Sequence, residues 1–329
     1  MPSTFSRTTE RPLRIWRFRD GKPGHENQTA GLVQALERRC HLQLHEFTSV
    51  PAPRALAWWL GGRYPPGAGL PAPDLILGAG HATHLPMLAA RRAHGGRVLV
   101  LMKPSLPCRW FDLCLVPEHD RPPARPNLMT TCGVLTPVRP GVKDPRLGLI
   151  LLGGPSRHHD WPPALVLRQV RAILAANPRD PWEITDSRRT PPGLLAELAA
   201  GGLPPGSRIL PWRATPPGWL AGRLAEATRV WVSEDSVSML YEALSAGAAV
   251  GLIQLPRRSH GRVAHGLDAL AEAGRIVPFD AWRAGRPLQP PARPLDEAGR
   301  CADAILARGW CPPGARRVAA GTPPGEAAP

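Results

Sequence analysis

A short polar segment near the start of the chain, residues 20–28, holds several residue types that can do chemistry. Asp20 and His25 can each act as a general base toward a hydroxyl group. The glycines in this segment let the backbone pass close to a ligand, and the helix that follows presents amide N–H groups to an anion. Lys22, Gly24 and Asn27 are therefore candidate ligand-binding residues. The Walker A ending GKS or GKT is missing, and an ordinary strand-to-helix loop with a polar cap is the alternative.

The richest cluster of hydroxyl and carboxyl groups lies at residues 233–243, SEDSVSMLYEA. Asp235 or Ser236 could cap the helix that begins here. Ser238 falls in the first turn, where its hydroxyl can donate to a phosphate, and Glu242 lies one to two turns into the helix. A carboxylate at that place can accept two hydrogen bonds from the hydroxyls of a ribose. A capped helix with a solvated glutamate is the alternative.

Two further segments follow apolar runs and contain groups suited to binding a diphosphate. In GGPS at 153–156, Gly153, Gly154 and the Ser156 hydroxyl could form an anion cradle, although a plain turn has the same composition. In SRRT at 187–190, Arg188 could bind an anion through its guanidinium fork with Thr190 beside it. A solvated loop is the alternative for this second segment.

The histidines raise the question of a metal site, because His81 and His84 are three residues apart and follow Gly80 at a predicted strand end. No HExxH sequence occurs, and the carboxylates are not paired at the spacing of metal ligands. We therefore expect no protein-bound metal. Hydrogen bonding to a substrate or helix capping is the expected role of these histidines.

The charge balance is strongly basic, with 41 Lys+Arg against 26 Asp+Glu, a net charge of +15 and a pI of about 11.0. Such a surface attracts phosphate groups on a nucleotide sugar or on anionic lipid. Only three basic residues are lysines, Lys22, Lys103 and Lys143, so arginine fills nearly every position that needs a cation. No nucleic-acid recognition motif occurs, and the arginines are scattered, so nucleic acid is not an expected partner.

The segments that target or anchor proteins are not recognisable in this sequence. No apolar run approaches the length of a transmembrane helix, and the first residues lack the apolar core of a secretory signal. No two of the six cysteines have CxxC spacing. We expect a cytoplasmic protein with free thiols, for which a peripheral, charge-driven contact with an anionic membrane surface remains open.

Strands and helices alternate along the whole chain, which is typical of parallel, doubly wound sheets. The first series has expected strands at 14–18, 42–47, 74–80, 97–103, 111–120 and 127–133, with a helix at 27–39. The second has strands at 147–156, 182–190, 229–235 and 249–256, with helices at 163–176, 236–247 and 260–274. The pattern predicts two Rossmann-like α/β domains facing a central cleft, with ligands at the carboxyl ends of the strands.

The same pattern gives domain limits. We expect a flexible N-terminus at 1–11, a first domain at 12–143, a second domain at 144–294, a final helix at 295–310 and a disordered tail at 311–329.

Six ordered segments of this chain resemble the mitochondrial-fission Elm1-type family: DGKPGHENQ at 20–28, MKPSLP at 102–107, PEHD at 117–120, GGPS at 153–156, SRRTP at 187–191 and EDSVSMLYEA at 234–243. The resemblance spans about residues 12–310. Bacterial members of this family are described as glycosyltransferases of lipooligosaccharide outer-core assembly. The resemblance implies a GT-B fold, in which the second domain holds a nucleotide-sugar donor, the first holds a glycan or glycolipid acceptor, and the last helix crosses back.

The resemblance also implies roles for single residues. Ser236 and Ser238 would face phosphate and Glu242 would face ribose, with GGPS and Arg188 completing the donor pocket. Asp20 or His25 would act on the acceptor hydroxyl, with Glu118 and His119 as rivals. Lys103 would help to neutralise the diphosphate. The chemistry would be metal-independent, with no bound cofactor other than the donor substrate.

Two other functions fit the same motifs. A sugar-nucleotide 2-epimerase has the same fold and converts its donor without an acceptor. A non-enzymatic adaptor is the second alternative, because eukaryotic members of the family are linked to recruitment of a fission GTPase. The polar residues at the strand ends favour a ligand-binding site over a bare scaffold.

Overall fold

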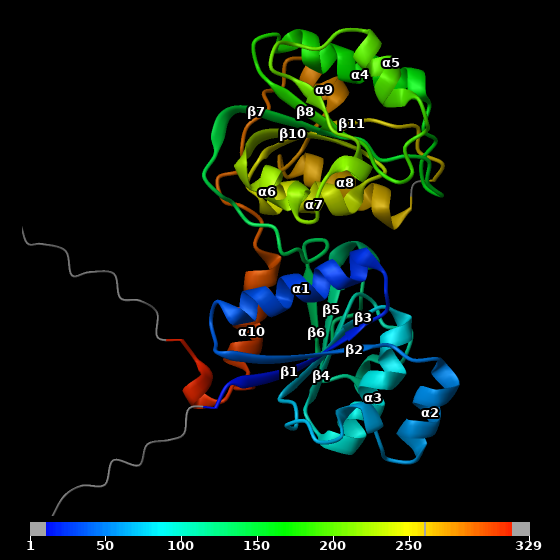
Figure 1. Cartoon of the computed structure of the whole chain (residues 1–329), viewed down its shortest axis with the longest axis vertical. Coiled ribbons are helices and arrows are strands. Elements are labelled where there is room, and N and C mark those ends of the chain that lie inside the picture. Colours follow the sequence, from blue (N-terminus) through cyan, green and yellow to red (C-terminus); the bar gives the residue numbers. More distant parts are fainter. Residues whose placement is uncertain (1–10, 260, 318–329) are drawn as a thin grey trace, which may run out of the picture. The chain divides into compact units, whose positions relative to one another are not determined.

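The computed structural model describes residues 11–259 and 261–317, and these form two compact units (Figure 1). Among the described residues, the first unit comprises 11–117, 122–131 and 297–317, and the second comprises 118–121 and 132–296. The units differ from the predicted domain limits in three places, because residues 118–121, 132–143 and 295–296 group with the second unit. The final helix groups with the first unit.

The first unit is built on a parallel six-stranded sheet with the order β2-β1-β3-β4-β5-β6. Its elements are β1 (Leu13–Arg19), α1 (Pro23–Glu37), β2 (Leu42–Thr48), α2 (Ala52–Leu60), β3 (Leu75–Ala79), α3 (His84–His94), β4 (Arg97–Leu101), β5 (Leu113–Pro117), β6 (Leu128–Thr131) and α10 (Glu297–Ala307). An aromatic cluster fills part of its core, where the Trp16 and Phe47 rings lie 4.9 Å apart and Phe18 stacks on Phe47 at 5.2 Å.

The second unit has another parallel six-stranded sheet, with the order β12-β11-β10-β7-β8-β9. Its elements are β7 (Asp144–Leu151), α4 (Pro163–Ala176), β8 (Trp182–Thr185), α5 (Leu194–Ala200), β9 (Arg208–Ile209), α6 (Trp219–Glu226), β10 (Ala227–Ser233), α7 (Val237–Ser245), β11 (Ala249–Ile253), α8 (Arg262–Glu272), β12 (Val277–Pro278) and α9 (Phe279–Arg283).

Both faces of this second sheet are buried, which explains why its strands read as continuous apolar runs. Leu149 and Leu151 point into one core cluster, whereas Ile150 points into the other, because successive side chains alternate across a strand. Figure 1 shows α4, α5 and α9 on one face of the sheet and α6, α7 and α8 on the other. The doubly wound α/β architecture predicted from the sequence is therefore confirmed.

Several predicted boundaries were wrong. Helix α1 begins at Pro23 rather than at residue 27, because proline at the first helical position fixes the backbone angle that a helix requires. Helix α2 was not predicted, since prolines surround it. The short elements β9, α9 and β12 were also missed.

The last described residues were predicted to be disordered, but residues 311–317 pack against the first unit. The Sγ atoms of Cys311 and Cys40 lie 3.2 Å apart and are buried, and both thiols are free. The backbone N–H of His41 donates to the Ala315 carbonyl at 2.8 Å. The predicted flexible residues 1–10 and tail residues 318–329 lie outside the described residues.

Candidate functional site

The Asp235 carboxylate is the centre of a polar cluster at the carboxyl edge of the second sheet. Its side chain is fully buried, and it lies two residues beyond Ser233, where β10 ends. Five donors surround it: the N–H of Gly154 (3.0 Å), Trp161 Nε1 (3.0 Å), Ser233 Oγ (2.8 Å), Ser236 Oγ (3.1 Å) and Arg189 Nη2 (2.7 Å). The carboxylate therefore holds the ends of three strands together, and its oxygens are already occupied by protein donors.

The glycines Gly153 and Gly154 are required by this packing. A Cβ atom on Gly153 would overlap the Asp235 carboxylate, and one on Gly154 would overlap the backbone of Arg189. The Gly153 N–H also donates to Ser233 Oγ at 2.7 Å. From the sequence, the two glycines were expected to let a ligand approach the backbone closely. In the structure, the groups that lie close to them belong to the ends of neighbouring strands.

The arginine that joins this cluster is Arg189. Its Nη1 atom donates to the Gly154 carbonyl at 3.0 Å, in addition to the bond from Nη2 to Asp235. Arg188, the residue chosen from the sequence, is exposed, and its guanidinium carbon lies 5.9 Å from the centre of the Trp212 ring. Arg189 is exposed as well, and adjacent arginines in a loop cannot be told apart from sequence alone, because the loop conformation decides which one reaches Asp235.

Two predicted binding hydroxyls are used within the protein. Thr190 Oγ1 donates to the carbonyls of Leu152 and Gly153 at the end of β7. Ser156 Oγ accepts the backbone N–H groups of His158 and His159 at 3.2 and 3.1 Å, which closes a turn. These hydroxyls shape the loops at the sheet edge.

The amino terminus of α7 is the part of the cluster best suited to an anion. Ser236 occupies the N-cap position, but its hydroxyl donates to Asp235, and no side chain within the described part of the chain caps the helix. The first-turn amides of a helix have no partner within the helix, so an uncapped terminus can bind phosphate. Ser238 is exposed in this first turn, and Glu242 is half-buried in the next.

Behind this helix terminus lies a buried ion pair that the sequence did not reveal. Glu234 is 2% exposed and accepts hydrogen bonds from the Leu255 N–H at 3.0 Å and from Arg257 Nε at 2.5 Å. Burial alone would raise the pKa of Glu234, but its contacts with His159, the Leu255 N–H and Arg257 outweigh burial and lower it. The ionised carboxylate therefore anchors β11 to the end of β10.

A second polar group lies at the carboxyl edge of the first sheet, where β1 leads into α1. His25 Nδ1 lies 2.8 Å from Asp20 Oδ2, with the Asp20 side chain 1% exposed and the His25 side chain 22% exposed. The backbone N–H of Lys22 donates to the other Asp20 oxygen at 3.2 Å. A carboxylate on Nδ1 favours the tautomer whose Nε2 carries the basic lone pair. The predicted Asp20 and His25 thus form one unit.

Gly80, at the end of β3, lies directly against this pair. Its φ is +86°, and a Cβ atom built on it would come 2.7 Å from Asp20 Oδ2 and closer still to the His25 ring. The absence of a side chain here allows the carboxylate and imidazole to pack on the neighbouring strand. Because α1 begins at Pro23, Gly24 and Asn27 lie in its first turns and Lys22 is its N-cap residue.

The neighbouring strand ends add a second group of histidines. Ser105 Oγ lies 2.5 Å from His81 Nδ1 and 3.1 Å from His84 Nδ1. Burial, together with nearby His81, lowers the pKa of His84 to about 4, so the ring is neutral near pH 7. Ser105 was not chosen from the sequence, although it lies in the MKPSLP segment. The predicted Lys103 is exposed two residues beyond the end of β4.

An apolar cavity of about 180 Å³ adjoins these histidines. Besides His81 and His84, its lining is almost entirely aliphatic: Val50, Pro51, Ala52, Ala82, Leu85, Pro86 and Leu106. A cavity with this lining excludes water from a group bound there, which strengthens polar interactions at its edge.

The predicted Glu118 and His119 are placed differently from Asp20 and His25. They lie in a short turn that packs against α8 and groups with the second unit. Asp120 in the same turn pairs with Arg262 at 2.8 Å. Burial lowers the pKa of His119 below its usual value, with Asp120 opposing that shift and Arg262 adding to it. Glu118 and His119 therefore belong to a different unit from Asp20 and His25.

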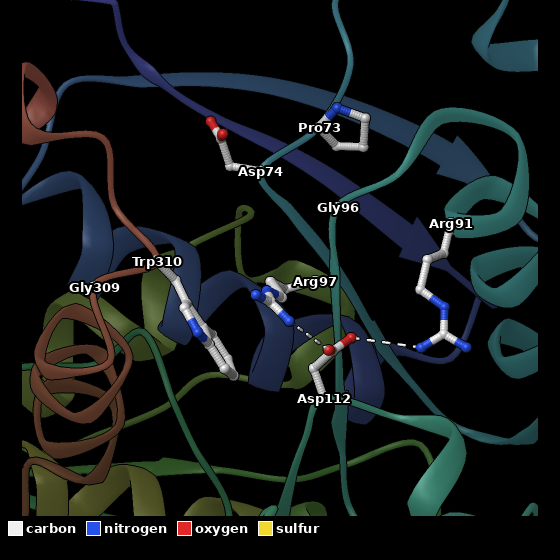
Figure 2. Close-up of a pocket in the computed structure, with 8 residues that line it drawn as sticks. All are labelled: Pro73, Asp74, Arg91, Gly96, Arg97, Asp112, Gly309 and Trp310. Carbon is white, nitrogen blue, oxygen red and sulfur yellow. Dashed lines mark hydrogen bonds and ion pairs between the residues drawn. The ribbon is translucent and has the colours of Figure 1, made fainter.

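A larger cavity of about 510 Å³ lies at the opposite, amino-terminal edge of the first sheet (Figure 2). There Asp112 pairs with Arg97 at 3.2 Å and with Arg91 at 3.5 Å, and it accepts the Val98 N–H at 2.8 Å. The Arg97 guanidinium also lies 5.7 Å from the Trp310 ring centre. These charges neutralise one another, and ligands of open parallel sheets bind at the other edge.

Within 11–259 and 261–317, no group of three or more His, Cys, Asp or Glu side chains is placed to hold a metal ion. None of the helices described for this chain has the length and apolar character needed to cross a bilayer.

Solved structures with a similar fold include two UDP-N-acetylglucosamine 2-epimerases. A protein of Listeria monocytogenes described as such an enzyme has a TM-score of 0.54 at 13% identity, with 90% of this chain and 95% of that chain covered. The enzyme of Methanocaldococcus jannaschii has a TM-score of 0.55 at 11% identity, with coverage of 90% and 100%. MurG of Acinetobacter baumannii covers 91% and 92% at 15% identity and a TM-score of 0.48.

The likeness to the two epimerases establishes the fold, which is a two-domain α/β fold of the GT-B type. A comparison with curated protein sequences gives no match. The sequence profile of the family described as mitochondrial fission ELM1 matches residues 23–309, which is most of the chain and includes all the segments that carried the resemblance except the first three residues of one. The chain therefore belongs to the mitochondrial fission ELM1 family.

Proposed function

We propose that this protein transfers a sugar from a nucleotide-sugar donor to a hydroxyl group of a glycan or glycolipid acceptor of the lipooligosaccharide-core type. The observation that carries the proposal is the uncapped amino terminus of α7, which has Ser238 in its first turn and Glu242 in the next. Amide N–H groups and a hydroxyl suit a diphosphate, and the carboxylate suits the hydroxyls of a ribose. The epimerases of similar fold are named for a nucleotide-sugar substrate, which supports the same donor class.

The Asp20–His25 pair supplies the base for the acceptor. His25 Nε2 takes the proton of the acceptor hydroxyl while Asp20 stabilises the imidazolium that forms. The acceptor oxygen then bonds to the anomeric carbon, and the bond from that carbon to the diphosphate oxygen breaks. The nucleoside diphosphate leaves with the electron pair, and the α7 amides stabilise its charge. Each step uses residues of this chain without a metal.

The first experiment measures binding and release of nucleotide. Purified protein is titrated calorimetrically with UDP-, GDP-, CMP- and dTDP-sugars, and release of free nucleotide is followed with each donor. We expect one nucleotide class to bind, and Ser238→Ala and Glu242→Gln each to weaken binding about tenfold, as loss of a ligand hydrogen bond does. Glu272→Gln, an exposed glutamate on α8, is the matched control and should bind normally.

The same assay separates the alternatives. Conversion of the donor to its epimer without any acceptor would assign the protein to the epimerases that share its fold. Absence of binding and turnover with every donor would refute the enzymatic proposal and favour an adaptor.

A further inference from the structure

Helix α2 has a composition unlike that of an ordinary surface helix. Its sequence, APRALAWWL, contains one charged residue, Arg54, and no other polar side chain. One side packs on α3, where Ala55 is buried and Trp58 and Trp59 are partly buried. The opposite side is exposed, and Figure 1 shows α2 at the edge of the first unit. An apolar helix face is normally covered by another element, whereas nothing among residues 11–259 and 261–317 covers this outer side.

The exposed side carries large apolar residues at helical spacing. Leu56 is 41% exposed and Leu60 is 63% exposed, and residues four apart lie on the same face of a helix. The same turns also expose three small residues, Ala52, Pro53 and Ala57. Their side chains contain no polar atoms. The outer face of α2, defined here by Leu56 and Leu60 with these small residues, is a continuous apolar surface.

Three exposed arginines lie on or next to α2. Arg54, Arg63 and Arg92 are exposed, and the Arg92 guanidinium lies 6.0 Å from the centre of the Trp59 ring. The Trp59 ring stacks on Trp110 at 5.9 Å. Residues 47–111 contain seven basic residues and a single acidic one, Asp74. Asp74 is paired with Arg11 at 2.7 Å, and Arg91 and Arg97 are paired with Asp112. The positive charge beside α2 therefore comes from Arg54, Arg63 and Arg92.

We propose that the outer face of α2 docks on the surface of an anionic lipid bilayer. Leu56 and Leu60 would enter the boundary between head groups and acyl chains, and Arg54, Arg63 and Arg92 would contact lipid phosphates. Tryptophans beside such a face suit the interface because their rings are amphipathic. The arginine-rich rim favours phosphates over an apolar protein partner, since it lacks the neutral polar rim typical of protein interfaces.

The apolar cavity described above extends this surface toward the chemical groups of the first unit. Pro51 and Ala52, at the start of α2, line that cavity together with His81 and His84. If the proposed function holds, docking through α2 brings a lipid-borne acceptor to the sheet edge that carries the Asp20–His25 pair. The docking itself does not depend on that function.

The test is flotation of the purified full-length protein with vesicles. One set is phosphatidylcholine alone, and in the other about a third of the lipid is phosphatidylglycerol. We expect binding to the anionic vesicles that weakens as salt is raised. The double variant Leu56→Gln/Leu60→Gln should lower the partition coefficient about tenfold or more, and Arg54→Gln/Arg63→Gln/Arg92→Gln roughly a hundredfold.

The control is Val142→Gln, which replaces a side chain that is 91% exposed in the second unit and should leave binding unchanged. Circular dichroism and nucleotide binding check that each variant is folded. Equal binding of the Leu56→Gln/Leu60→Gln variant and the parent would overturn the proposal, as would binding to neither vesicle. A dimer of the parent that this variant converts to a monomer, without vesicle binding, would instead identify an interface between copies of the chain. Failure of the vesicle test with intact nucleotide binding would leave the proposed function standing.

Discussion

Arg189 and Asp235 are 46 residues apart in the sequence, and a hydrogen-bonded ion pair of 2.7 Å joins the loop after β8 to the end of β10. The Asp235 side chain is fully buried, so this guanidinium and the neighbouring donors supply the hydrogen bonds that water would otherwise make. Arg189→Ala should lower the free energy of unfolding by about 2 kcal/mol, because a buried carboxylate loses a charged donor. Urea denaturation followed by circular dichroism measures this change.

Arg188→Ala is the matched control for that variant. It removes an exposed arginine from the same loop, and we expect a change within about 0.5 kcal/mol. Equal destabilisation by the two variants would contradict the assignment of the cluster to Arg189. If Arg188 binds the donor, Arg188→Ala will weaken nucleotide binding while stability is preserved.

Gly80 tests the packing around the Asp20–His25 pair. Gly80→Ala places a methyl group against both side chains at a φ of +86°, so we expect a loss of about 3 kcal/mol in stability and loss of turnover. Gly24→Ala in α1 is the control, because its Cβ would meet nothing within 4 Å. That variant should be neutral or more stable by up to about 1 kcal/mol. A stable, active Gly80→Ala protein would show that the pair is not confined as described.

The Asp20–His25 pair can be tested through kinetics. His25→Gln should lower kcat by about a hundredfold to ten-thousandfold with nucleotide affinity unchanged, because it removes the base and leaves the donor site of the second unit intact. Asp20→Asn should also lower kcat, since it loses the preference for the reactive tautomer. His41→Gln, an exposed histidine of the same unit, is the control. Parent-like kcat in His25→Gln would remove this residue from the mechanism.

His84 predicts a pH dependence of stability. Its pKa in the folded protein is about 4, below the usual value of 6.5, so the unfolded chain takes up a proton more readily as the pH falls. Stability is therefore lost below about pH 6.5 and continues to fall toward pH 4, with about 2 kcal/mol lost between pH 7 and pH 5 from this group.

The control for that prediction is His84→Asn, which does not titrate. Urea denaturation at pH 7 and pH 5 should show a smaller pH difference in this variant than in the parent, even if its stability at pH 7 is lower. His119 also has a lowered pKa, so some acid sensitivity should remain. An unchanged pH difference would contradict the burial of a neutral His84.

Most of the fold could be predicted because its strands are buried on both faces. A short apolar run such as 147–152, when turn residues bound it, is best interpreted as a buried strand. Helix α2 escaped prediction because its apolar pattern shows no polar face and prolines adjoin it. The order of strands within each sheet is set by long-range packing, which a single sequence does not display.

The candidate site was predictable at the level of segments and less so at the level of atoms. The Asp20–His25 pair follows from two residues in one loop, but the donors that occupy Asp235 come from loops far apart in the sequence. The sequence suggested no role for Lys143, one of the three lysines of the chain. In the structure its Nζ donates to the carbonyls of Leu224 at 3.3 Å and Ala227 at 2.8 Å, at the end of α6. Burial lowers the pKa of Lys143, and the residue caps a helix.

The grouping of residues 297–317 with the first unit affects the order in which the protein can be completed during synthesis. Helix α10 packs against α1, yet it leaves the ribosome after every residue of the second unit. The second unit, which ends at residue 296, is therefore the first to have its whole sequence available. The first unit cannot complete its fold until α10 has been synthesised, and until then the side of α1 that packs on α10 stays exposed. This unit is therefore the one that chaperones and proteases can reach on the nascent chain.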